Sequence, residues 1–217
     1  MTDFKNYGFK LQKLHEVYGE IAKNTEYIRE KPATERVLKE TEKKLEYTIP
    51  PCMRELFIFF SRKIVFSAWL PEELELPHAL RDIFSASFEI SVDELINAER
   101  SRKSWVNECF SNPLDSYDKV WHNKLGFMTV ANGDVIAFDL DDDRDDKRVI
   151  YLSHDDGRGH GYVLGDNFDD FFCNLLLVGG CGNEDWQMMP FIENATSGIN
   201  PNCENAKIFR ELIGLYW

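Results

Sequence analysis

The dipeptide Asn132-Gly133 constrains the fold most strongly, because it separates two short apolar runs. The runs cover residues 125–131 and 135–138. An Asn-Gly pair in this setting is the strongest short-range signal of a β-hairpin, since a type I′ turn requires positive φ at both central residues. Glycine adopts positive φ without a steric penalty, and asparagine tolerates it. The sequence therefore predicts a hairpin with Gly133 at positive φ in a type I′ turn.

Two further strands and two polar loops follow the hairpin. Residues 139–148 are rich in aspartate, which is a poor strand former, so we expect a solvated loop there. The apolar run 149–153 predicts the next strand, and residues 162–164 predict a short fourth strand. Residues 154–161 lie between these strands and are too rich in glycine to form an element.

A helix is predicted over residues 167–178. Its apolar side chains recur at helical spacing and form one wide face: Phe168, Phe171, Phe172, Leu175, Leu176 and Val178. Asp166 is the expected N-cap, because its carboxylate can accept from an amide of the first turn. Gly179-Gly180 is expected to end the helix.

The first half of the chain is predicted to be mainly helical. We expect helices over residues 4–30, 34–47 and 51–62. The first is amphipathic and is expected to pack on the core, with a docking arm as the alternative. In the third, the apolar residues Ile58 and Phe59 suggest burial nearly all round.

Two short strands and a capped helix come next. Residues 64–70 and 88–90 predict strands. Ser91 and Glu94 fit a capping box, in which Ser91 accepts from a first-turn amide and Glu94 reaches back to the Ser91 amide. The helix that follows is expected to reach about residue 110.

The C-terminal part predicts one more helix, over residues 201–213. Before it, Trp186 and Phe191 are expected to pack against the sheet. The whole pattern indicates an α+β fold, with a mostly antiparallel central sheet flanked by N- and C-terminal helices.

The segments 125–134, 149–157 and 167–172 resemble the SUKH superfamily. Residues 45–50 and 56–60 are similar to the family's opening, a helix followed by a proline-marked link and a second apolar helix. The founding members of that superfamily are fungal cell-wall-assembly regulators. Many bacterial members are immunity proteins that neutralise polymorphic toxins, often nucleases.

The resemblance covers roughly residues 33–180, and implies a single SUKH-like domain over residues 1–217 with a helical extension at each end. The function that it favours is an immunity protein that binds and blocks a cognate toxin, with no enzymatic activity of its own. A regulatory or scaffolding module of the fungal type is the alternative. A hydrolase using His154 and Asp155 is a third hypothesis.

The net charge of −13 bears on the partner. It argues against nucleic acid or an anionic membrane as a direct partner, and it permits a basic protein partner, whose approach such a field accelerates. Solubility alone is the competing explanation of the charge.

The five cysteines contain no CxxC pair and are odd in number, so they suggest neither a disulfide framework nor a zinc site. The amino terminus lacks the apolar core of a signal peptide. The apolar runs are too short to cross a bilayer. We therefore expect a cytoplasmic protein.

Two segments could carry chemistry, and each has a simpler explanation. The aspartate run could bind calcium, but it lacks the Gly and Glu of an EF-hand loop. His154 and Asp155, with Arg158 and His160 nearby, could act as a general base or metal ligands. The resemblance implies instead that this segment closes a strand–loop junction. Since the glycines after residue 156 do not lead directly into a helix, they do not form a phosphate cradle. We therefore expect no cofactor and no metal.

The aspartates of the two loops are the predicted toxin-binding residues: Asp139, Asp141, Asp142, Asp143, Asp145, Asp146, Asp155 and Asp156. They form one patch only if both loops lie at one end of the sheet. Because the loops follow successive strands, antiparallel pairing would instead place them at opposite ends. A single patch could imitate nucleic-acid phosphates in the cleft of a nuclease.

Overall fold

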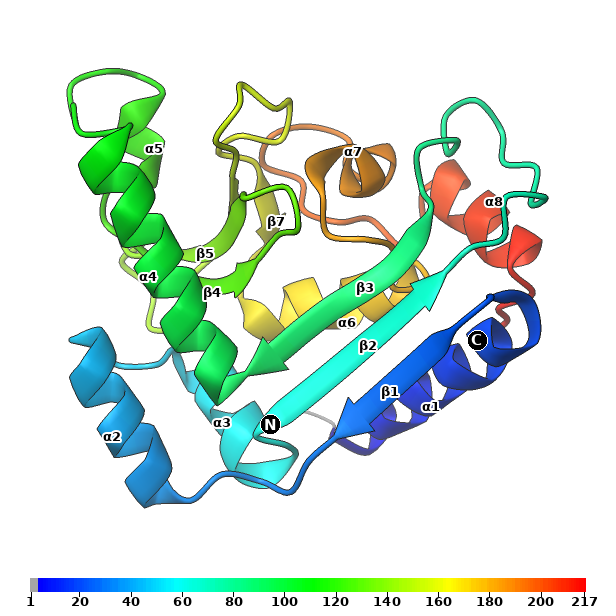
Figure 1. The fold of residues 1–217 in the computed structure, drawn as a ribbon, viewed down its shortest axis with the longest axis horizontal. Helices are drawn as coiled ribbons and strands as arrows, with labels where there is room; N and C mark the ends of the chain where they lie inside the picture. The colour runs from blue at the N-terminus through cyan, green and yellow to red at the C-terminus, as the bar shows by residue number, and fades with distance from the viewer. Residues whose placement is uncertain (1–3) are drawn as a thin grey trace.

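The computed structural model describes residues 4–217 and shows an α+β fold with two antiparallel sheets (Figure 1). Sheet A has the order β1-β2-β3, with strands Thr25–Arg29, Lys63–Trp69 and Ser85–Ser91. Sheet B has the order β4-β5-β6-β7, with strands Lys124–Thr129, Val135–Asp139, Val149–Leu152 and Val163–Gly165. The predicted α+β fold is confirmed, and its strands are divided between two sheets.

The helices surround these sheets. They are α1 (Phe4–Ile21), α2 (Glu35–Leu45), α3 (Pro51–Phe59), α4 (Val92–Glu108), α5 (Asp118–Trp121), α6 (Phe168–Leu177), α7 (Asp185–Met188), the 3₁₀ helix η1 (Met189–Phe191) and α8 (Glu204–Leu212). Across residues 4–217, no helix combines the length and the apolar character that a membrane span requires.

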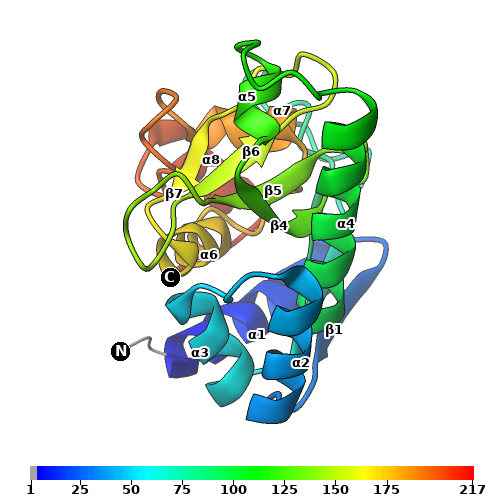
Figure 2. The same cartoon turned by 90° about the vertical axis from the view of Figure 1, so that its left-hand side faces the viewer.

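Helix α6 joins the two sheets through its phenylalanines. Phe168 and Phe171 each pack edge-on against Phe127 of β4, at ring-centroid distances of 5.8 and 5.9 Å. Phe172 packs against Phe88 of β3 at 5.7 Å. Figure 2 shows α6 beneath sheet B, with α1 and α3 on its other side. One helix therefore supplies core side chains to both sheets.

Helix α4 closes the free edge of sheet B. The Gly126 amide of β4 donates to Glu99 Oε2 at 2.9 Å, and the Thr129 amide donates to Glu94 Oε1 at 2.8 Å. A Cβ at Gly126 would lie 2.7 Å from the carbonyl oxygen of Ala98, so only glycine permits this approach. The edge amides of β4 are thus paired with carboxylates of a helix.

Half of the predicted capping box is confirmed. Ser91 Oγ accepts from the Glu94 amide at 2.9 Å, as expected. The prediction of a reciprocal bond from the Ser91 amide to Glu94 is wrong, because the Glu94 carboxylate accepts from Thr129 of strand β4 instead. The tertiary contact satisfies an edge amide that would otherwise be unpaired.

The prediction of one helix over residues 4–30 is wrong at its C-terminal end. Helix α1 ends at Ile21, and residues 25–29 form β1, the outer strand of sheet A. Thr25, Tyr27 and Ile28 favour a strand when a partner strand is available. The expected packing of the helix on the core is confirmed, since Tyr18 is buried and its hydroxyl donates to the carbonyl of Gly179 at 2.9 Å.

Two local predictions in the second half also differ from the structure. The N-cap of α6 is Asn167, whose side chain accepts from the Asp170 amide at 2.9 Å, rather than Asp166. Trp186 is 41% exposed instead of packed on the sheet, whereas Phe191 is buried as expected.

The central hairpin is confirmed over β4 and β5, but its turn is not type I′. Gly133 has φ +103°, whereas neither Ala131 nor Asn132 has positive φ. The Gly133 amide donates to the Val130 carbonyl at 2.9 Å, and the Val130 amide donates to the Asp134 carbonyl at 3.0 Å. This is a three-residue loop, in which only the third residue needs the left-handed region.

We predict that Gly133→Val destabilises the protein by about 1–3 kcal/mol, the cost of backbone strain at such a site. A Cβ at Gly133 would meet only ordinary contacts, at 3.5 Å from His154, so crowding is not the reason. Chemical denaturation measures the change. Gly19→Ala is the control: it has open space around it within α1, and should stabilise the protein by about 0.5–1 kcal/mol. An unchanged midpoint for Gly133→Val would contradict the strain argument.

Candidate functional site

The two aspartate-rich loops lie at opposite ends of sheet B. Strands β5 and β6 are antiparallel, with Phe138 opposite Val149 and Val135 opposite Leu152. The loop of residues 140–148 therefore leaves one end of the sheet, and the loop of residues 153–162 leaves the other. The hypothesis of one continuous acidic patch is wrong, because successive loops of an antiparallel sheet alternate ends.

Most carboxylates of the 140–148 loop are bound within the protein. Lys124 Nζ lies 2.9 Å from Asp139 and 2.5 Å from Asp141. Asp142 accepts from the Arg144 guanidinium, and Arg144 holds the pKa of this carboxyl below its usual range. These ion pairs and hydrogen bonds hold the loop in its conformation. Lys124 and Arg144 compensate much of the negative charge of the carboxylates that they contact.

Asp146 caps helix α3 from outside the helix. The N-cap residue Pro50 forms no side-chain capping bond. Asp146 Oδ1 accepts instead from the Cys52 amide in the first turn, at 2.7 Å. A carboxylate at this position also interacts favourably with the helix dipole. The loop is thereby attached to the start of α3.

The capping role predicts that Asp146→Ala lowers the free energy of unfolding by about 0.5–2 kcal/mol, the usual cost of a lost N-cap. Asp143→Ala is the matched control from the same loop; this exposed residue should change stability by less than about 0.5 kcal/mol. Urea unfolding of both variants measures the two changes in the free energy of unfolding. Equal stability of the two variants would refute the capping role.

Asp143 and Asp145 are the two exposed aspartates of this loop that form no ion pair with another residue in the part of the chain that the structure describes. Asp145 lines a shallow groove of about 330 Å³, together with Pro51 and Arg54 of α3. A second groove, of about 170 Å³, shares Pro51 and Arg54. We call the two grooves together the α3 surface, and Asp143 is a loop neighbour of its residue Asp145.

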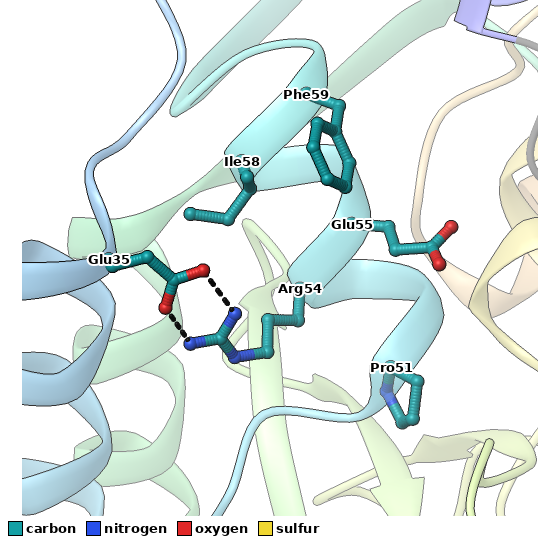
Figure 3. A pocket seen from close by; sticks show the side chains of 6 residues that line it. All are labelled: Glu35, Pro51, Arg54, Glu55, Ile58 and Phe59. Atoms are coloured by element: carbon teal, nitrogen blue, oxygen red, sulfur yellow. Dashed lines mark hydrogen bonds and ion pairs between the residues drawn. The ribbon is translucent and has the colours of Figure 1, made fainter.

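Figure 3 shows the second of these grooves. Glu35 of α2 and Arg54 of α3 face one another across it in a two-bonded ion pair, with N–O distances of 3.1 and 2.5 Å. Ile58 and Phe59 form its apolar part. Phe59 is 67% exposed, so the prediction of burial around the whole helix is wrong. Spacing alone identified the core face, Met53, Leu56 and Phe57, and should have left Phe59 outside it.

At the other end of sheet B, the side chain of Asp134 organises the loop. Asp134 is fully buried. Its Oδ1 accepts from the amide and Nδ1 of His154, and its Oδ2 accepts from Asn132 and from the Tyr151 hydroxyl. Each oxygen thus has two donors, which is its ordinary capacity.

Three ligand-type groups come together there: Asp134, His154 and Asp155 offer atoms within 4.8 Å of one another. Asp134 already accepts four hydrogen bonds, and His154 Nδ1 is held by Asp134. The nearby Ser153 hydroxyl donates to Asp155 rather than to His154. The residues are therefore arranged to close the strand–loop junction, as the sequence resemblance implied.

His160 is held in its neutral form by two backbone groups. The Ser153 amide donates to its Nδ1 at 3.1 Å, so the ring proton is on Nε2, which donates to the Tyr117 carbonyl at 3.1 Å. Tyr117 also stacks on the ring at 3.8 Å. Burial lowers the pKa of His160.

This geometry predicts a pH dependence of stability. Because the folded pKa of His160 is lowered, the unfolded chain binds a proton that the folded chain does not, and stability falls as the pH drops below about 6.5. Urea unfolding midpoints between about pH 5 and pH 7.5 measure how stability changes with pH. This range extends about one pH unit or more on each side of the ordinary imidazole pKa. In His160→Gln this slope should be smaller than in the wild type. Identical slopes would exclude His160 as the cause.

A comparison of the chain with family models matches the SMI1 / KNR4 family (SUKH-1) over residues 32–174. No curated protein matches the chain. The matched segment begins before α2 and ends within α6. It agrees closely with the 33–180 segment expected from the sequence, and it contains both aspartate-rich loops and all of α3.

Proposed function

Because the chain belongs to the SMI1 / KNR4 family (SUKH-1), which includes toxin immunity proteins, we propose that it is an immunity protein. It binds a cognate toxin domain in the cytoplasm and blocks it by covering the toxin's active or substrate-binding surface. No residue performs chemistry in this mechanism. Inhibition depends on shape, buried area and charge.

The observation that carries the proposal is the composition of the α3 surface. Protein interfaces combine an apolar centre with a polar rim, and exposed aromatic side chains are frequent anchors. Here Phe59 and Ile58 supply the apolar part, while Asp145 and Glu55 supply acidic groups. Asp143 is exposed two residues before Asp145 in the same loop. Glu35 and Arg54 cross the middle as a preformed ion pair.

The partner that fits this surface is a basic domain. The protein carries a net charge of −13, which accelerates the approach of a cationic partner. A nuclease is the favoured toxin class, since its substrate cleft attracts phosphates and would also attract the carboxylates of Asp143 and Asp145. The other predicted contact residues of this loop, Asp139, Asp141, Asp142 and Asp146, act mainly by shaping it.

We also propose that residues 1–217 form a single SUKH-like domain. The two extensions outside the family match contribute to the same hydrophobic core as the matched segment. From the N-terminal side these residues include Leu11 and Leu14, and from the C-terminal side Phe209 and Ile213.

The test is the association rate with the toxin domain encoded beside the protein's gene. Asp143→Asn/Asp145→Asn should slow association roughly two- to tenfold at low ionic strength and flatten its salt dependence, because two steering charges are lost. Asp155→Asn/Asp156→Asn is the matched control, with the same charge change at the opposite end of sheet B. It should leave both quantities near wild type.

Phe59→Ser tests the apolar part of the surface. It should raise the dissociation rate and weaken binding by more than about 1 kcal/mol, as an interface anchor does, with little loss of stability. Surface plasmon resonance separates the two rates. Full protection by Phe59→Ser and by Asp143→Asn/Asp145→Asn, both with wild-type kinetics, would show that the toxin docks elsewhere.

A further inference from the structure

A larger groove lies at the end of sheet B away from the α3 surface. It has a volume of about 680 Å³ and is lined by three segments: the β2–β3 loop, the start of the 153–162 loop, and α7 with η1. Figure 1 shows α7 between these two loops. We call it the Trp186 groove, because Trp186 of α7 lines it and is 41% exposed.

The walls of this groove are held together by hydrogen bonds. Asp185 is buried, and its carboxylate accepts from the Gly159 amide at 3.1 Å and from the Trp186 amide at 2.7 Å. The Asp185 amide in turn donates to the Tyr151 hydroxyl at 3.0 Å. Helix α7 is therefore attached both to the 153–162 loop and to β6. A preformed groove of this kind orders few side chains when a ligand enters, which lowers the cost of binding.

Carboxylates outnumber cations among the charged side chains that line the groove. Asp82, Asp155 and Asp156 line it, as do Arg81 and Arg158. Arg81 lies 3.7 Å from Asp82, so these two largely compensate one another. Asp155 and Asp156 are exposed beside the single remaining cation, and the buried Asp185 adds further negative charge. An anionic ligand would be repelled, and a cationic one attracted.

We infer that the Trp186 groove binds an arginine side chain presented by an extended segment of a protein partner. A guanidinium is planar, so it can stack on the exposed indole of Trp186 while its N–H groups pair with a carboxylate. Asp155 and Asp156 line the same groove and supply that carboxylate. Lysine, a compact and strongly hydrated charge, uses the flat aromatic wall less well. Met189 adds a polarisable apolar contact for the arginine stem.

This site is separate from the α3 surface. The carboxylates of the two surfaces lie in loops at opposite ends of β6. A partner bound to the α3 surface therefore leaves the Trp186 groove open. The arginine-bearing segment is presented by a partner other than the one on the α3 surface.

The experiment uses the full-length protein and a defined probe, the peptide acetyl-Gly-Arg-Gly-amide. The indole N–H signal of Trp186 in an NMR spectrum, assigned with Trp186→Leu, should move in a saturable way as the peptide is added. The same peptide with citrulline is the key control, because citrulline keeps the shape of arginine and lacks its charge. It should cause no saturable shift.

Each carboxylate that is removed should weaken binding by about two- to fivefold, as for exposed ion pairs. Asp155→Asn/Asp156→Asn should show the combined loss, and Asp143→Asn/Asp145→Asn should bind the peptide as the wild type does. A thermal melt confirms that each variant is folded. The inference is overturned if arginine and citrulline peptides give the same shifts, if no signal moves at millimolar peptide, or if the Asp155/Asp156 variant retains wild-type affinity.

Discussion

The packing of α6 between the two sheets is the interaction on which the rest of the structure depends. This helix supplies core side chains to both sheets: Phe168 and Phe171 cover sheet B, and Phe172 covers sheet A. Aromatic side chains bury large areas and fix ring geometry, so one short helix can hold two layers in register. The positive-φ pair Gly179 and Gly180 then turns the chain beside α1 and sheet A, where a Cβ on Gly180 would lie 3.4 Å from Leu14 and 3.6 Å from Phe88.

Sheet B is completed by ionised side chains rather than by more strands. Glu99 is almost fully buried, yet its two oxygens bind the Gly126 amide and the Arg102 guanidinium. Arg102 in turn donates to the Trp121 carbonyl at 2.8 Å. A buried ion pair of this kind is costly to break, because removing one member leaves the other charge without compensation. The protein's acidic composition is thus partly structural, with carboxylates acting as acceptors for edge amides and helix starts.

Sequence patterns over a few neighbouring residues were sufficient to predict the elements that are stabilised mainly by contacts between such neighbours. The hairpin, the amphipathic α6 and the Ser91 cap all follow from neighbouring residues, and all are present. The strand β1 was missed because Thr25 to Arg29 becomes a strand only by pairing with β2, some forty residues later along the chain. The Glu94 carboxylate was misassigned for the same reason, since its partner Thr129 is distant in sequence.

In the candidate site, too, features set by neighbouring residues were predictable and features set by distant residues were not. Apart from Asp139, which is the last residue of β5, the aspartates were correctly located in loops. The sequence does not indicate which of these carboxylates already form hydrogen bonds or ion pairs within the protein. Lys124, Arg144 and the Cys52 amide occupy most of those in the 140–148 loop, and only tertiary structure brings these groups together. The exposed Phe59 was predicted as buried because an apolar residue in an apolar helix gives no sign of its orientation except through spacing.

The bond between Asp146 and the Cys52 amide has a consequence for how the loop and the helix move. Because Pro50 cannot cap α3 with its own side chain, fraying of the first turn of α3 and opening of the 140–148 loop are coupled through this bond. Any ligand that holds the loop closed must, by linkage, also protect the first-turn amides of α3 from hydrogen exchange. The amide of Cys52 is therefore a backbone reporter of the closed state of this loop.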